Sequence, residues 1–183
     1  LIAIVNIDFK NLLKSYKSKW ALFGALIGLA AILTFNRFYS TAISFFYQMS
    51  DNDNETSLNN IIVVYPIISL FVFGIVGPIV EELTYRVGLF ESLKKICKSK
   101  VPAYIVTMLI FALIHFAFDS VTTFIMTGDS AYMINELLNL PLYLGAAFVF
   151  TFLYDKIGFA ASANCHIFNN LLSVGLTIIL SLL

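Results

Sequence analysis

Long apolar runs recur along this chain, and they constrain its fold more than any other feature. One runs from Trp20 to Phe35, and others cover 61–80, 101–118, 136–154 and 159–183. A helix needs about 20 apolar residues to cross the hydrocarbon core of a bilayer, which is roughly 30 Å thick. Because 60% of the 183 residues are hydrophobic and only 12% are charged, we predict an all-α, polytopic transmembrane helix bundle with about five to six membrane helices.

The segments between these runs alternate in charge. Lysines cluster within 10–19 and again within 94–100, whereas 50–60 and 119–135 contain acidic residues and no base. Since positive residues favour the cytoplasmic side, we predict lysine-rich loops in the cytoplasm and acid-rich loops outside. Residues 1–19 mix lysines with apolar residues, which predicts an N-terminal interfacial helix.

These boundaries divide the chain into two parts. The N-terminal part, 1–60, comprises the amphipathic helix, the first membrane span and an external loop, and 61–183 forms the membrane core. The chain begins with Leu1 and not with Met, so we interpret it as a fragment or a shortened chain and draw nothing from the lack of a signal peptide. The formal net charge of +0 gives no indication of a nucleic-acid partner.

Three ionisable residues, Glu81, Glu82 and Arg86, follow one apolar run directly. Ionisable side chains at membrane depth are costly and mark candidate functional sites. On a helix, Glu82 and Arg86 are one turn apart and can pair, whereas Glu81 has no cation one turn away. A continuous helix from residue 61 to Lys94 would be about 50 Å long, so a break is needed. Pro66 and the region from Gly74 to Pro78 offer break points, and we predict a kink just before Glu81.

Histidines in two later runs lie at a similar depth. Counted at helical rise from the lysine-rich boundaries, Glu81 and His115 are about 20 Å deep and His166 is about 15 Å deep. Independent polar residues on three helices have no reason to share a level. We therefore predict one buried polar site between the helices.

Helical spacing also places pairs of these residues on common faces. Phe111 and His115 are four apart, as are His166 and Asn170, while Asn169 points about 100° away. A glutamate and a histidine can hold a water, and a histidine with an amide can face a substrate, which are the components of hydrolysis. Each residue also has a structural interpretation, because intramembrane histidines and asparagines often join helices and a buried ion pair can neutralise itself.

Three motifs, in order, resemble those of the CAAX prenyl protease and bacteriocin-processing (CPBP) family. They are Glu81-Glu82-x-x-x-Arg86, Phe111-x-x-x-His115 and His166-x-x-x-Asn170, and the resemblance covers about residues 61–180. The family contains intramembrane proteases related to the type II CAAX endopeptidase, and bacterial members tied to bacteriocin processing, immunity and peptide-signal maturation. The resemblance implies that 61–183 is a catalytic core in a bacterial cell membrane. Its substrate would be a membrane-associated peptide or protein segment that enters from the cytoplasmic side.

The same resemblance implies roles for the motif residues. Glu81, as general base, activates the attacking water together with His115. His166 and Asn170 hold the developing oxyanion. The supporting residues are Glu82 and Arg86, which orient the segment, and Phe111, which packs beneath His115.

A metal is an open alternative at this site. Glu81, His115 and His166 could supply three ligands for a catalytic zinc with a bound water. The sequence lacks the two-histidine helical signature of zincins, however. We therefore favour a mechanism without a metal and predict no cofactor, with zinc at these three residues as the alternative.

Two other functions compete with peptide hydrolysis. A catalytically silent protein of the same fold could act in bacteriocin immunity or as a scaffold that binds a membrane partner. A small transporter could use Glu81 to carry protons, but the sequence shows neither repeat halves nor a second broken helix. The oligomeric state is open as well, because the pair Gly24 and Gly28 could admit a helix of the same chain or of another.

Overall fold

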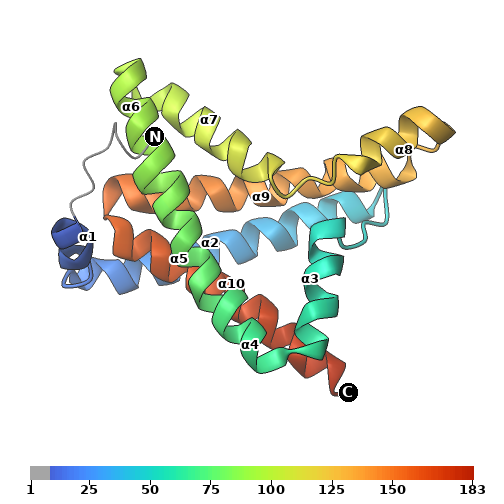
Figure 1. Ribbon diagram of the computed structural model, residues 1–183, viewed down its shortest axis with the longest axis horizontal. Helices are drawn as coiled ribbons and strands as arrows, with labels where there is room; N and C mark the ends of the chain where they lie inside the picture. The colour runs from blue at the N-terminus through green and yellow to red at the C-terminus, as the bar shows by residue number, and fades with distance from the viewer. Residues whose placement is uncertain (1–8) are drawn as a thin grey trace.

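A computed structural model describes residues 9–183, which form helices joined by short connections (Figure 1). Four helices are long and apolar enough to cross a membrane: Lys19–Ser44, Pro66–Cys97, Ala131–Lys156 and Phe159–Ser181. A fifth apolar helix, Lys100–Leu113, is shorter. The predicted all-α polytopic bundle is confirmed, and the described residues contain no strand.

The N-terminal helix α1 (Phe9–Ser15) is the described part of the predicted interfacial helix, of which residues 1–8 lie outside the described residues. The hydroxyl oxygen of Ser15 accepts a hydrogen bond of 3.0 Å from the Ala160 N–H at the start of α10 (Phe159–Ser181). Lys100, at the start of α7 (Lys100–Leu113), pairs at 2.7 Å with Asp155, near the end of α9 (Ala131–Lys156). Both lysine-rich segments therefore lie at the end of the bundle where α9 turns into α10.

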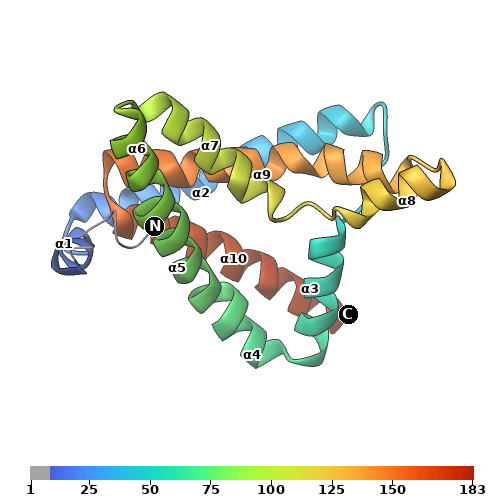
Figure 2. The same ribbon diagram turned by 45° about the horizontal axis from the view of Figure 1, so that its top comes forward.

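Helix α2 (Lys19–Ser44) packs within the chain through its glycines. A Cβ added at Gly28 would lie 2.6 Å from Leu153 Cδ1 and 2.9 Å from Cys165 Sγ, which is closer than side chains approach. Gly24 faces the same helices. The pair therefore admits α9 and α10 of the same chain, and α2 and α9 run side by side in Figures 1 and 2.

The second long helix runs unbroken from Pro66 to Cys97 and carries the Glu-Glu pair. Its segments are α4 (Pro66–Phe71), η1 (Val72–Val76), α5 (Gly77–Glu82), η2 (Leu83–Phe90) and α6 (Glu91–Cys97), of which η1 and η2 are π-helical. The backbone at Val76 and Gly77 is helical, so no break in the helix directly precedes Glu81, and the predicted kink there stays a prediction. The break lies at Tyr65, with φ −128° and ψ 61°, because a residue before proline avoids the helical region.

Two shorter helices, α3 (Asp53–Val64) and α8 (Asp119–Thr127), lie at the other end of the bundle, in or beside the acid-rich segments. Asn52 starts α3 by accepting the Glu55 N–H at 2.9 Å through Oδ1. The buried carboxylate of Glu136, near the start of α9, accepts the N–H groups of Asp53 at 2.9 Å and Ala117 at 3.1 Å. Glu136 therefore joins the start of α3 to the segment that precedes α8.

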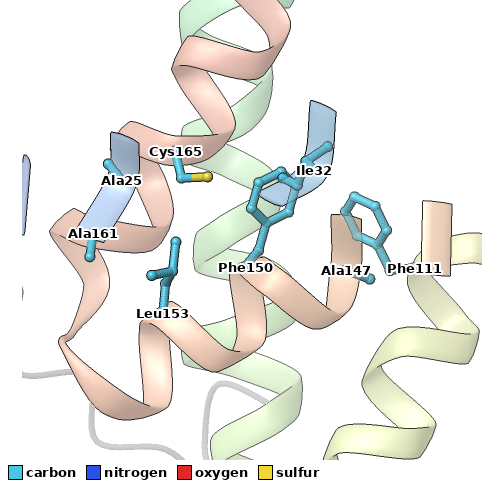
Figure 3. Packing of buried hydrophobic residues seen from close by; sticks show 8 residues of the cluster. All are labelled: Ala25, Ile32, Phe111, Ala147, Phe150, Leu153, Ala161 and Cys165. Atoms are coloured by element: carbon cyan, nitrogen blue, oxygen red, sulfur yellow. The ribbon is translucent and has the colours of Figure 1, made fainter. Parts of the chain in front are cut away.

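The core lies where α2, α7, α9 and α10 meet (Figure 3). It consists of small, aliphatic and aromatic side chains that pack together: Ala25, Ile32, Phe111, Ala147, Phe150, Leu153, Ala161 and Cys165. The outer faces carry exposed apolar side chains, for example Phe38, Phe46 and Ile67. This distribution suits a bundle whose outer surface contacts lipid.

Candidate active site

A buried carboxylate, that of Glu82 in α5, supports the site. Arg86 Nη1 lies 3.1 Å from Glu82 Oε1, which also accepts a hydrogen bond of 2.9 Å from Nδ1 of His166. Ser162 Oγ lies within hydrogen-bonding distance of the other oxygen, Oε2. A buried carboxylate requires such partners, because removing one partner of a buried ion pair typically costs about 3–5 kcal/mol. Glu82 is therefore fully engaged in holding the helices and the histidine.

The guanidinium group of Arg86 completes this support. It lies 4.8 Å from the ring centroid of Phe111 and 5.3 Å from that of Phe150. Its Nη2 lies 3.4 Å from the carbonyl oxygen of Ala147. A desolvated cation over aromatic faces gains about 2 kcal/mol. Arg86 thus ties η2 to α7 and α9.

His166 of α10 is held from two directions. Its ring stacks on Phe150, with centroids 4.3 Å apart and planes 17° apart. Because the carboxylate of Glu82 accepts hydrogen bonds, we assign the proton of the contact to Nδ1 of His166. The other ring nitrogen, Nε2, lies 3.8 Å from Oε2 of Glu81. This distance is longer than a direct hydrogen bond and suits a contact between the two atoms through a bridging water.

Glu81 differs from its neighbour in sequence. Its side chain is 30% exposed and lines a cavity. Its Oε2 is buried and has no hydrogen-bond partner among the described residues. An unpaired buried acceptor costs about 1–3 kcal/mol, which favours the arrival of a donor. The carboxylate of Glu81 is therefore available for chemistry, whereas that of Glu82 is not.

His115 lies in the turn that follows α7, and not on the helix as predicted, because α7 ends at Leu113. Its ring still covers Phe111, with centroids 4.9 Å apart. Nδ1 lies 2.8 Å from the Phe111 carbonyl oxygen. Since a carbonyl oxygen only accepts, Nδ1 is the donor and Nε2 of the neutral ring is left as an acceptor.

Asn170 is anchored and retains one free donor. Its Nδ2 donates to the carbonyl oxygen of Phe73 in η1 at 3.0 Å, so the second amide hydrogen remains available. Asn169, which we predicted to point away, lines the same cavity, and its Nδ2 lies 3.5 Å from Asn170 Oδ1. The two adjacent amides contact each other, which explains why both reach the cavity wall.

One cavity of about 560 Å³ connects these groups. Its wall includes the four residues predicted as catalytic: Glu81, His115, His166 and Asn170. The volume is in the range of small-ligand sites. The structure therefore brings together, at one cavity, residues from three distant stretches of the chain.

The cavity extends toward the acid-rich segment, where its lining includes Asp51, Asn54 and Glu55. No lysine or arginine is among the described lining residues. Partial burial, and then the nearby carboxylate of Asp51, raise the pKa of Glu55 above its ordinary value. The predicted entry of the substrate from the cytoplasmic side stays a prediction.

The family model described as type II CAAX prenyl endopeptidase Rce1-like matches residues 63–172, which is more than half of the chain. The chain belongs to this family. The matched stretch of the Rce1-like chain contains all four candidate catalytic residues, and the resemblance to CAAX proteases is confirmed. Together with its apolar helices, this membership makes the chain an integral membrane protein of an intramembrane protease family. A search of curated proteins and a search of solved structures each gave no match.

Three residues of this Rce1-like site were not predicted from the sequence: Ser162, Tyr143 and Asn52. Ser162 lies one helical turn before His166, so its spacing did contain a signal. Tyr143 stacks on the His115 ring at 4.5 Å, and Asn52 bonds Tyr143 across 91 residues of sequence. No local spacing indicates contacts at such a separation.

The alternative zinc site was tested against the geometry of the Rce1-like chain. In the part of the chain that the structure describes, no three histidine, cysteine or acidic side chains converge closely enough to hold a metal ion. Histidines with Nδ1 held and Nε2 free would suit a metal, but Glu81, His115 and His166 do not meet at one point. The arrangement of the described residues does not fit a three-ligand zinc site.

Proposed function

We propose that this chain is an intramembrane endopeptidase that hydrolyses a peptide bond in a membrane-associated peptide or protein segment. One observation supports this most directly. The unpartnered Oε2 of Glu81 faces Nε2 of His166, whose other nitrogen is held by the buried Glu82. Membership of the type II CAAX prenyl endopeptidase Rce1-like family supports the same chemistry.

In the proposed mechanism, a water in the cavity donates a hydrogen bond to Glu81, and Nε2 of His115 accepts a second one. Glu81 takes a proton as the water oxygen bonds to the carbonyl carbon of the substrate. The mechanism uses His166 as the imidazolium, which carries a hydrogen on both ring nitrogens before the substrate binds. Its Nδ1–H donates to Glu82, and its Nε2–H stabilises the negative charge on the carbonyl oxygen together with the free amide hydrogen of Asn170. Glu81 then returns the proton to the departing nitrogen as the C–N bond breaks, which releases an acid and an amine.

The substitution Glu81→Gln tests the general base. Glutamine preserves the size of the side chain but cannot take the proton, so we expect cleavage to fall by about 10²–10⁴-fold. A quenched fluorescent peptide library presented to the reconstituted protein gives the rate, and mass spectrometry of the fragments identifies the bond.

The matched control is Glu91→Gln, which changes a glutamate of the same long helix that pairs with Lys94 and does not line the described cavity. This variant should cleave at the wild-type rate. Cleavage by Glu81→Gln at that rate would remove Glu81 from the mechanism. A wild-type protein that cleaves nothing, with a cellular phenotype that survives Glu81→Gln and His115→Ala, would favour an immunity or scaffold role.

The metal-free form of the mechanism is tested in the same assay. The purified protein is treated with a chelator, its metal content is measured by mass spectrometry, and its cleavage rate is compared with that of untreated protein. We expect full activity in metal-free protein. A loss of activity on metal removal, followed by recovery when zinc is added, would overturn the metal-free mechanism.

A further inference from the structure

His115 needs support that the other catalytic candidates do not. Glu81, His166 and Asn170 lie within helices, whereas His115 lies in the turn between α7 and α8. A displacement of about 1 Å at a reacting group can cost about 10²-fold in rate. Other contacts must therefore fix this turn.

Tyr143 of α9 provides the first of these contacts. Its ring stacks on that of His115, with centroids 4.5 Å apart and planes 19° apart. Phe111 covers the same imidazole at 4.9 Å. The Tyr143 hydroxyl lies 3.1 Å from Nδ2 and 3.3 Å from Oδ1 of Asn52. Two aromatic rings thus contact the imidazole, and the second ring is itself anchored.

Asn52 provides the second contact. Its side chain is buried, and Nδ2 also donates to the main-chain carbonyl oxygen of His115 at 3.3 Å. Its Oδ1 accepts the Glu55 N–H that starts α3. Asn52 is not among the described residues that line the cavity. It therefore contacts the turn of His115 without contacting a molecule in the cavity.

The segment around Asn52 is itself fixed on α9. The carboxylate of Glu136 accepts the N–H of Asp53, next to Asn52, and that of Ala117, two residues after His115. Both ends of the contact between Asn52 and the turn are therefore tied to one buried side chain. Such a fully bonded polar network is rigid.

We propose that Asn52 and Tyr143 are positioning residues for His115. Asn52 precedes the stretch 63–172 that the family model matches, so a segment outside that stretch completes the site. The effect on rate rests on the proposed function. The position of the His115 ring does not, because it is a property of the fold.

Nuclear magnetic resonance tests the position directly. The chain has two histidines, so the full chain labelled at histidine Cε1 gives two ring signals, which are assigned by substituting each histidine. The Tyr143 ring shifts the His115 signal by its ring current. Tyr143→Leu moves this signal through the loss of its ring current alone, so Asn52→Ala, which keeps both rings that contact the imidazole, tests the position. Asn52→Ala should move the His115 signal and leave that of His166 in place, whereas Tyr143→Phe, which keeps the ring, should leave both near their wild-type positions.

Kinetics test the consequence for catalysis. Asn52→Ala should lower kcat by about tenfold to a hundredfold and leave KM unchanged within about twofold, because its effect passes through His115. Asn52→Ala also removes the N-cap of α3, so the matched control is Ser18→Ala, which removes the N-cap of α2 outside the site. Ser18→Ala should leave kcat and KM unchanged. Should Asn52→Ala not fold, Asn52→Asp is the second variant, because it keeps the oxygen that caps α3 and loses the amide group that donates to the His115 carbonyl.

Each outcome decides one part of the proposal. An unchanged His115 signal in Asn52→Ala overturns the positioning role of Asn52, whatever the activity. An unchanged signal in Tyr143→Leu contradicts the stacking of Tyr143 on His115. A displaced His115 signal with an unchanged kcat would show that the position of His115 is not important for the reaction. A wild-type protein without peptidase activity contradicts the proposed function instead, and the signals still decide whether these residues position His115.

Discussion

Two adjacent glutamates occupy very different environments at the scale of single residues. Consecutive helix positions differ by about 100°, so Glu82 points into the bundle and Glu81 faces the cavity. Glu82 is paired with Arg86 and His166, while Glu81 Oε2 has no partner among the described residues. One carboxylate therefore aligns the histidine, and the other is left to act on what enters.

The buried ion pair predicts a large effect on stability. Arg86→Met keeps much of the volume but leaves Glu82 without its cation, so we expect a loss of about 3–5 kcal/mol. Thermal unfolding in detergent measures it. Lys94→Met breaks the partly exposed pair with Glu91, which is 2.7 Å long, and should change stability by no more than about 1 kcal/mol. Equal losses in both variants would contradict the structural role of Arg86.

At the scale of elements, the sequence predicted helices better than it predicted their ends. His166 and Asn170 face one cavity because both lie on α10, so their spacing was informative. His115 was misplaced because the contacts that fix the turn after α7, those of Asn52 and Glu136, come from distant segments. The break at Tyr65 was signalled by the following proline, one of the two break points that the sequence offered.

Close packing of α2 gives a second stability prediction. A Cβ at Gly28 would meet Leu153 Cδ1, Cys165 Sγ and Val149 Cγ1 within 3.1 Å. Gly28→Ala should therefore destabilise the chain by about 1–3 kcal/mol through overpacking. At Gly175 no atom lies within 4 Å of an added Cβ, and Gly175→Ala should be neutral or stabilise by up to about 1 kcal/mol. A stable Gly28→Ala variant in the same unfolding assay would show that α2 can move away.

At the scale of the whole molecule, the two parts predicted from the sequence share one site. Residues of 50–60 line the cavity together with residues of 61–183. The boundary at residue 60 stays a prediction, but residues on both sides of it line the same cavity. Truncation at that boundary would remove part of the cavity wall.

The length of α7 predicts a dependence on the bilayer. Its 14 residues span about 21 Å, against a hydrocarbon core of roughly 30 Å. Cleavage should be faster in vesicles of short-chain lipids than in vesicles of long-chain lipids, because a thinner bilayer matches the short helix. The rates are compared at equal reconstitution, measured by the amount of inserted protein. A rate that rises with chain length would contradict this prediction.

The same short helix has a consequence for the solvent supply. α7 starts at the lysine-rich end and stops at the turn of His115, so its mismatch of about 9 Å falls on the leaflet beside the acid-rich segment. Lipid tails there must shorten or tilt, which draws headgroups and their hydration inward. We therefore expect a thinner membrane where the cavity extends outward, so that hydrophobic mismatch would bring water to the proposed hydrolysis.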